Sequence, residues 1–121
     1  MDPYKVLVVD DSAFMRKIIS DLISDHPHFV VAGTAKNGAE ALEQVKSLSP
    51  DVVTMDVEMP VMNGLEALSR IMAERPTPVV MLSSRTSEGA METICALERG
   101  AVDFVQKPSG SISLDLYKVK E

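Results

Sequence analysis

Five reactive side chains stand directly after four short apolar segments of the sequence. They are Asp10, Asp11, Asp56, Ser83 and Lys107. If each apolar segment is a buried parallel strand, these side chains meet at one edge of a sheet, because the crevice of an open α/β sheet lies outside the carboxyl ends of its strands. The sequence therefore predicts one candidate site built from separate parts of the chain.

The residue types at this predicted site suit phosphoryl transfer. Three carboxylates held together repel one another unless a cation or a proton offsets their charge, and oxygen ligands suit a hard ion such as Mg²⁺. A carboxylate nucleophile, a metal ion, and a hydroxyl and an ammonium group that hold phosphoryl oxygens complete the set. The simpler alternatives are a solvated acidic rim and a helix cap, but a cap at Ser12 needs only one of Asp10 and Asp11.

Short β-branched segments alternate with longer segments of helical periodicity. This pattern is typical of βα units that build a parallel sheet buried on both faces, so we predict an α/β fold. The predicted strands are 5–9, 29–33, 51–55, 79–82 and 102–106, and the predicted helices are 12–24, 39–48, 65–74 and 88–99. A doubly wound sheet needs a further covering helix, yet only 116–121 remain for it, so we expect the last helix to be truncated; a Ser/Gly-containing tail is the alternative.

Single residues predict how some of these elements begin and end. Asn37 is expected to cap the second helix, and Glu40 to complete a capping box with it. Gly100 is expected to end the fourth helix in a left-handed conformation, and Gly64 to relieve a turn before the third. We predict further that Met59 and Met62 could be exposed in the loop after Asp56, and that His26 and His28 are surface residues away from the acidic cluster.

Composition narrows the class of protein. A chain of 121 residues is one domain, and its net charge of −6 argues against a nucleic-acid-binding surface. Its apolar runs reach only four residues, too few for membrane insertion, so we expect a soluble, cytoplasmic protein. The single cysteine, Cys95, excludes an internal disulfide and cannot alone build a structural zinc site.

Several motifs resemble the receiver domain of two-component response regulators across essentially the whole chain. They are VLVVDDS at 6–12, DVVTMDVEMPVMNG at 51–64, the Ser83-Ser84 pair and KP at 107–108. The resemblance implies one receiver domain over 1–121, with a flavodoxin-like, doubly wound, five-stranded parallel sheet of order 2-1-3-4-5. It also implies a signalling switch that accepts a phosphoryl group from a histidine kinase.

The resemblance also implies roles for individual residues. Asp56 would be the phosphoacceptor, and Asp10, Asp11, Asp56 and the backbone carbonyl of Glu58 would hold Mg²⁺. Ser83 would move to meet the phosphoryl group, with Lys107 as the ion-pair partner of that group and Phe104 as the aromatic side chain that follows the switch. The implied modulatory residues are Glu58, Ser84 and Arg85, and we expect Glu58 and Arg85 to pair across the mouth of the crevice or to be two unrelated surface charges.

Finer features resemble one branch of this family, the receivers of chemotaxis protein-glutamate methylesterases. The carrying segments are VDDSAFMRK, MDVEMPVMNGLEAL and GAVDFVQKPSGSISLDL at 100–116. This resemblance implies a CheA-like kinase as phosphodonor and a C-terminal methylesterase and glutamine deamidase domain in cis, absent from this chain, which would act on chemoreceptors. The chain itself would carry only Mg²⁺-dependent phosphorylation and dephosphorylation of its own aspartate.

Two other functions stay open at this point. A free-standing CheY-like receiver would share all the site residues. A haloacid-dehalogenase-like phosphatase also uses an Asp nucleophile and Mg²⁺, but it needs D-x-D after its first strand, where this chain has adjacent acids. Many turnovers of a phosphoester per chain would favour the phosphatase, and at most one acyl phosphate per chain would favour the switch.

Overall fold

Apolar segments of the chain form a parallel sheet with the order β2-β1-β3-β4-β5. We describe residues 3–83 and 95–106 of this computed structural model. The strands are β1 (Tyr4–Val9), β2 (Phe29–Ala35), β3 (Val52–Asp56), β4 (Val79–Ser83) and β5 (Asp103–Gln106). Every neighbouring pair is parallel, which confirms the predicted α/β class.

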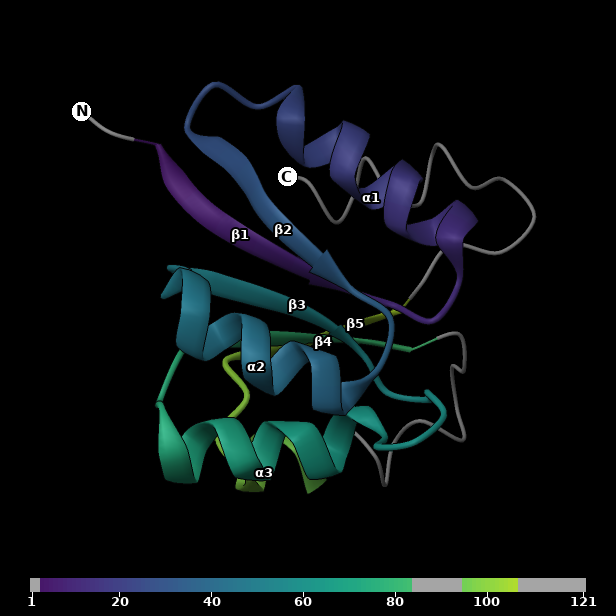
Figure 1. Ribbon diagram of the computed structural model, residues 1–121, viewed down its shortest axis with the longest axis vertical. Coiled ribbons are helices and arrows are strands. Elements are labelled where there is room, and N and C mark those ends of the chain that lie inside the picture. The colour runs from purple at the N-terminus through teal and green to yellow at the C-terminus, as the bar shows by residue number, and fades with distance from the viewer. Residues whose placement is uncertain (1–2, 84–94, 107–121) are drawn as a thin grey trace.

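Helices cover both faces of the sheet (Figure 1). Helix α1 (Ala13–Ser24) lies on one face, and α2 (Gly38–Leu48) and α3 (Gly64–Glu74) lie on the other. The larger apolar cluster joins α2 and α3 to the sheet, and the smaller one joins Ile19 of α1 to Val6, Val8 and Leu82. Central strands buried on both faces explain the nearly continuous apolar sequence of β1 and β4.

Helix starts differ from the prediction by one residue, because asparagine caps precede glycine in both α2 and α3. The side chain of Asn37 accepts a hydrogen bond from the Glu40 amide at 2.8 Å, as expected of a cap. The expected capping box does not close on Asn37, however, because the carboxylate of Glu40 accepts from the Lys36 amide at 3.3 Å. Residues 95–98 are helical, and Gly100 has a φ of 110°, which confirms the predicted end of the fourth helix.

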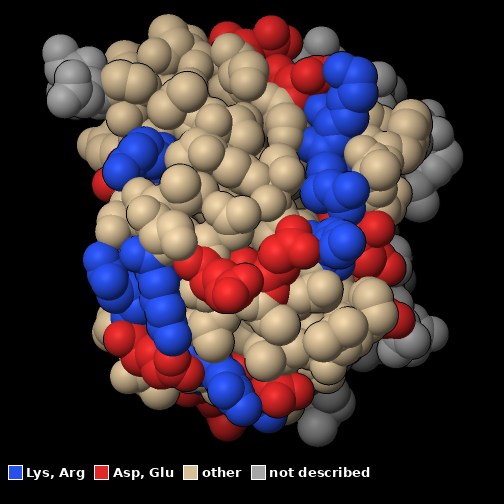
Figure 2. Space-filling model, viewed as in Figure 1, with Lys and Arg blue, Asp and Glu red and all other residues tan. Residues whose placement is uncertain are grey.

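Charged side chains of both signs are interspersed over the face that carries α2 and α3 (Figure 2). Lys46 of α2 and Glu74 of α3 form an ion pair at 2.7 Å. The hydrogen bond from Lys46 holds the pKa of the Glu74 carboxyl below its usual value. This exposed pair links the two helices but contributes little to stability, since water and salt screen it.

The loop after β3 has a strained tip. Val61 has a φ of 67° and is 83% exposed, and the Met62 amide donates to the Pro60 carbonyl at 2.7 Å. A three-residue turn with positive φ is rare, and a β-branched residue is poorly suited to it. Contrary to the expectation of exposure, Met59 and Met62 pack against the main apolar cluster and anchor both sides of this tip.

Replacing Val61 with glycine is therefore expected to stabilise the domain by about 1 kcal/mol, since glycine adopts positive φ without steric cost. Chemical denaturation of both proteins would measure the gain. The same substitution at Val30, an exposed residue of β2, is the matched control and should destabilise the domain, because glycine in a strand loses conformational entropy on folding. A loss of stability at both positions would show that the tip is not strained.

The expected truncated helix and residues 107–121 lie outside the described residues, as do residues 84–94 of the β4–β5 connection. Within 3–83 and 95–106, no helix is long and apolar enough to cross a membrane.

Candidate functional site: an acidic cluster at the carboxyl edge of the sheet

The register of the strands brings the predicted acids together. Val9 of β1 pairs with Met55 of β3, so Asp10 and Asp56 lie level with each other on neighbouring strands. One carboxylate oxygen from each of Asp10, Asp11 and Asp56 lies within 4.8 Å of the other two. Asp56 pairs in turn with Leu82 of β4, so Ser83 stands one residue further out beside it. The structure thus brings four of the five predicted side chains to one edge.

Asp10 is held by contacts on three sides. It is fully buried, and its amide donates to the Ala35 carbonyl at the end of β2, at 3.1 Å. Its carboxylate Oδ1 accepts from the Ser12 amide at 2.9 Å, while Ser12 caps α1. Its backbone carbonyl accepts from Nη1 of Arg16 at 2.8 Å. The position of this carboxylate is consequently set before any ligand arrives.

Asp56 is held mainly through the backbone that follows it. The Val57 amide donates to the Leu82 carbonyl at 3.0 Å, and the Gly64 amide donates to the Val57 carbonyl at 2.7 Å. A Cβ at Gly64 would overlap the backbone carbonyl of Asp56. The sequence predicts only that Gly64 relieves a turn. In the structure its lack of a side chain also lets α3 begin against the end of β3.

Burial divides the acidic residues into two kinds. Asp10 and Asp56 are buried, with Asp56 only 4% exposed, whereas Asp11 and Glu58 are exposed. Carboxylates this close repel one another, and a low-dielectric surrounding strengthens the repulsion. A divalent cation would offset the charge, and an all-oxygen donor set with one side open to water suits Mg²⁺, which retains several of its own waters. The cluster is therefore compatible with Mg²⁺.

The structure describes only some of the other predicted site residues. The backbone of Phe104 lies in β5, paired with Met81, and Ser83 is buried at the end of β4. Ser84, Arg85 and Lys107 lie outside the described residues, so the structure does not test the roles predicted for them.

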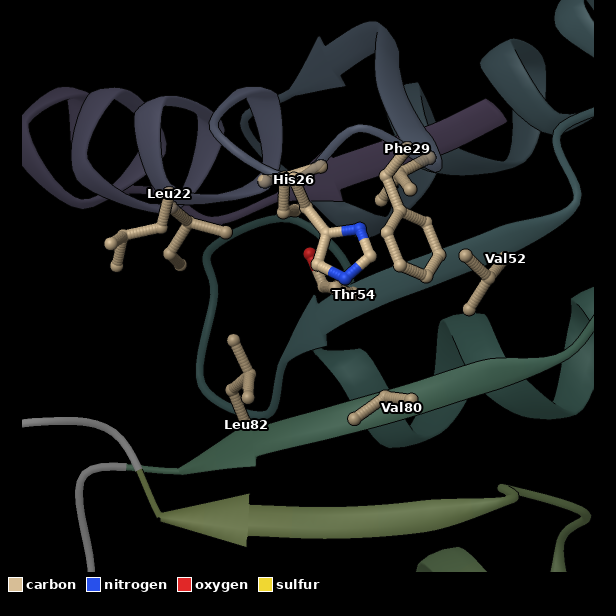
Figure 3. A pocket seen from close by; sticks show the side chains of 10 residues that line it. Leu22, His26, Phe29, Val52, Thr54, Val80 and Leu82 are labelled. Atoms are coloured by element: carbon tan, nitrogen blue, oxygen red, sulfur yellow. The ribbon is translucent and has the colours of Figure 1, made fainter. Parts of the chain in front are cut away.

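A separate apolar cavity of about 210 Å³ lies between α1 and the sheet, among side chains of β1, β3 and β4 (Figure 3). His26 contributes to its wall, and the imidazole packs on the ring of Phe29 with centroids 4.9 Å apart. The prediction that both histidines are surface residues therefore holds fully for His28, which is exposed, and only in part for His26, which is half-buried. The cavity holds none of the acidic cluster.

Sequence reasoning missed Arg16 and the packing role of Gly64. The side chain of Arg16 contacts a residue six positions earlier, which no strand or helix period indicates. The sequence offered one indirect signal. A basic residue near a helix N-terminus is electrostatically unfavourable, so the position of Arg16 could have indicated a contact outside the helix.

The comparisons with known proteins define the class of this domain. The family model described as response regulator receiver domain matches residues 6–116. The chain belongs to the response regulator receiver domain family, whose members are phosphoacceptor domains of two-component signalling.

Within that family the chain resembles the receivers of chemotaxis methylesterases. It is 69% identical, over its full length, to a protein-glutamate methylesterase/protein-glutamine glutaminase of Geobacillus kaustophilus, and it covers 35% of that protein. It matches the response regulator domain of Thermotoga maritima CheB with a TM-score of 0.88 and 56% identity, over 98% of this chain and 88% of that one. The chain spans about a third of the length of the curated relatives it matches.

A second similar structure is a complex with one domain of a CheA protein. It is the complex of the P1 domain of CheA3 with CheY6 from R. sphaeroides, with a TM-score of 0.79 and 37% identity, over 98% of this chain and 95% of the matched one. A receiver of this fold is therefore known bound to a domain of a CheA protein.

Proposed function

We propose that this domain is the phosphorylation-dependent switch of a chemotaxis methylesterase, and that Asp56 is its phosphoacceptor. The observation that supports this most directly is the position of Asp56. It ends a central strand, is buried, and has a carboxylate oxygen within 4.8 Å of an oxygen of Asp10 and an oxygen of Asp11. Membership of the receiver family and 56% identity to the CheB receiver of Thermotoga maritima support the same function.

The proposed reaction moves one phosphoryl group onto this carboxylate. An Asp56 oxygen attacks phosphorus, a new P–O bond forms, and the bond from phosphorus to the donor atom breaks with its electron pair leaving on the donor. Bound Mg²⁺ would neutralise developing negative charge on the phosphoryl oxygens. Asp10, Asp11 and the backbone carbonyl of Glu58 would hold the ion, and Ser83 would donate its hydroxyl hydrogen to a phosphoryl oxygen.

Mg²⁺ is expected to stabilise the isolated domain, because it relieves repulsion that only the folded state imposes. At ten times its Kd the gain is about 1.4 kcal/mol, which corresponds to roughly 5 °C in Tm for a domain of this size. Thermal unfolding with Mg²⁺ and with a chelator would measure it. Asp10→Asn should abolish the shift, whereas Glu43→Gln, which removes an exposed acid of α2, should leave it intact. An equal shift in both variants would argue against this metal site.

For the parent protein, we propose a CheA-like kinase as phosphodonor and a methylesterase domain in cis that acts on chemoreceptors. The names of the relatives and their greater length support this proposal. Glu58 and Arg85 would then shield the acyl phosphate from water. The number of phosphoryl groups transferred per chain from a small donor tests the proposed switch function. One acyl phosphate per chain is expected, and sustained turnover of a phosphoester would favour a phosphatase instead.

A further inference from the structure

The side chain of Arg16 reaches the acidic cluster from the end of the first turn of α1. It is half-buried, and its Nη1 donates to the backbone carbonyl of Asp10 at 2.8 Å. The Cα–Cβ bond of a helical residue tilts toward the helix N-terminus, so a long side chain at this position is directed back over the Ser12 cap. Arg16 thereby contacts the peptide that joins Asp10 to Asp11.

Helix stability does not explain an arginine at this position. Helix α1 begins at Ala13, and its first turn contains no acidic residue. The N-terminus of a helix carries partial positive charge, so a cation there is unfavourable and an acid would be preferred. The bond from Arg16 to the Asp10 carbonyl therefore needs an explanation in the cluster itself.

We propose that Arg16 is a positioning residue for the divalent cation of this site, an inference that rests on the proposed Mg²⁺-dependent function. Asp10 is held at its amide, its carboxylate and its carbonyl, and the first two partners are backbone groups of Ala35 and Ser12. The third partner is the guanidinium of Arg16. By fixing the Asp10 carbonyl, Arg16 fixes the orientation of the following peptide, from which the exposed Asp11 carboxylate extends.

Two effects of Arg16 on the cation oppose each other. Its positive charge repels Mg²⁺, while its hydrogen bond orders two of the acidic ligands. The guanidinium bonds to a neutral carbonyl oxygen, so this bond occupies no carboxylate oxygen of the cluster. Mg²⁺ demands nearly ideal octahedral geometry. If Arg16 is removed, the disorder of the ligands therefore weakens Mg²⁺ binding by more than the loss of the repelling charge strengthens it. The net effect of Arg16 is tighter binding of the cation.

Calorimetric titration with MgCl₂ tests this on the metal-free domain. Arg16→Met retains an unbranched stem but removes the donor, and it is expected to raise the Kd about tenfold, as loss of an outer partner of a metal ligand commonly does. Arg16→Lys, which retains a cationic donor, should restore part of the affinity. Lys17→Met is the matched control, because Lys17 pairs with Asp21 on the exposed side of the same helix, and its Kd should not change.

Unchanged or tighter Mg²⁺ binding by folded Arg16→Met would overturn the inference. A lower Tm of metal-free Arg16→Met together with an unchanged Kd for Mg²⁺ would also overturn it, because Arg16 would then have a purely structural role. If Arg16→Met does not fold, Arg16→Gln takes its place; it is too short to reach the carbonyl, so it should weaken binding, and a wild-type Kd would overturn the inference. Failure of the wild-type domain itself to bind Mg²⁺ would refute the proposed function instead.

Discussion

Asp56→Asn is expected to abolish labelling of the domain by acetyl phosphate and Mg²⁺ while leaving the fold intact. Asparagine has nearly the same shape as aspartate, but its amide is a poor nucleophile for phosphorus. The substitution also removes one of three carboxylates that repel one another, so the Tm of the metal-free protein should stay the same or rise. Intact-protein mass spectrometry would follow the labelling, and thermal unfolding would follow the stability.

Asp51→Asn is the matched control for this experiment. Asp51 directly precedes β3, at the opposite end of the strand from Asp56, where its carboxylate accepts a hydrogen bond from the Lys5 amide at 2.7 Å. This variant should be labelled at the wild-type rate. A phosphoryl group found on Asp10 or Asp11 in the wild-type protein, or labelling that persists in Asp56→Asn, would show that the phosphoacceptor is misassigned.

Gly64→Ala should destabilise the domain by about 3 kcal/mol, because overpacking of a tight contact forces the backbone apart. At an ordinary helix position the same change stabilises by up to about 1 kcal/mol, so the sign is diagnostic. The added Cβ would overlap the Asp56 carbonyl oxygen and crowd the Cα of Val57. Since both are backbone atoms of the strand end, we also expect the labelling rate to fall, as small displacements of a reacting group slow its chemistry strongly.

Gly33→Ala separates this local effect from a general effect of added volume. A Cβ at Gly33 would meet the ends of the Leu48 and Gln44 side chains, which can move aside. Gly33→Ala should lose less stability than Gly64→Ala, and its labelling rate should equal that of the wild type. Denaturant unfolding and the initial rate of labelling would be measured for both variants. Equal labelling by Gly64→Ala and the wild type would show that the contact does not position Asp56.

Helix boundaries were predictable to within a residue wherever a local signal marked them. Asn37 caps α2 through a contact three residues away, and Gly100 ends the fourth helix with a positive φ. The capping box failed because Glu40 could bond to either of two adjacent amides. The bond goes to Lys36, and only the path of the chain leaving β2 decided between the two. The partial burial of Met59, Met62 and His26 was missed for a similar reason, since the two methionines pack on the main apolar cluster and His26 lines a cavity with residues of β3 and β4.

The sequence by itself determined which residue types stand at the strand ends. Alternation of apolar strands with amphipathic helices leads to a parallel sheet, and a parallel sheet brings its carboxyl ends to one edge, so Asp10, Asp11 and Asp56 could be grouped without coordinates. The tertiary structure decided how that group is held. The Arg16 bond to Asp10 and the close approach of Gly64 to Asp56 depend on side-chain direction and backbone separation in three dimensions. Spacing along the chain carries no information about either, because both are contacts between elements rather than properties of one.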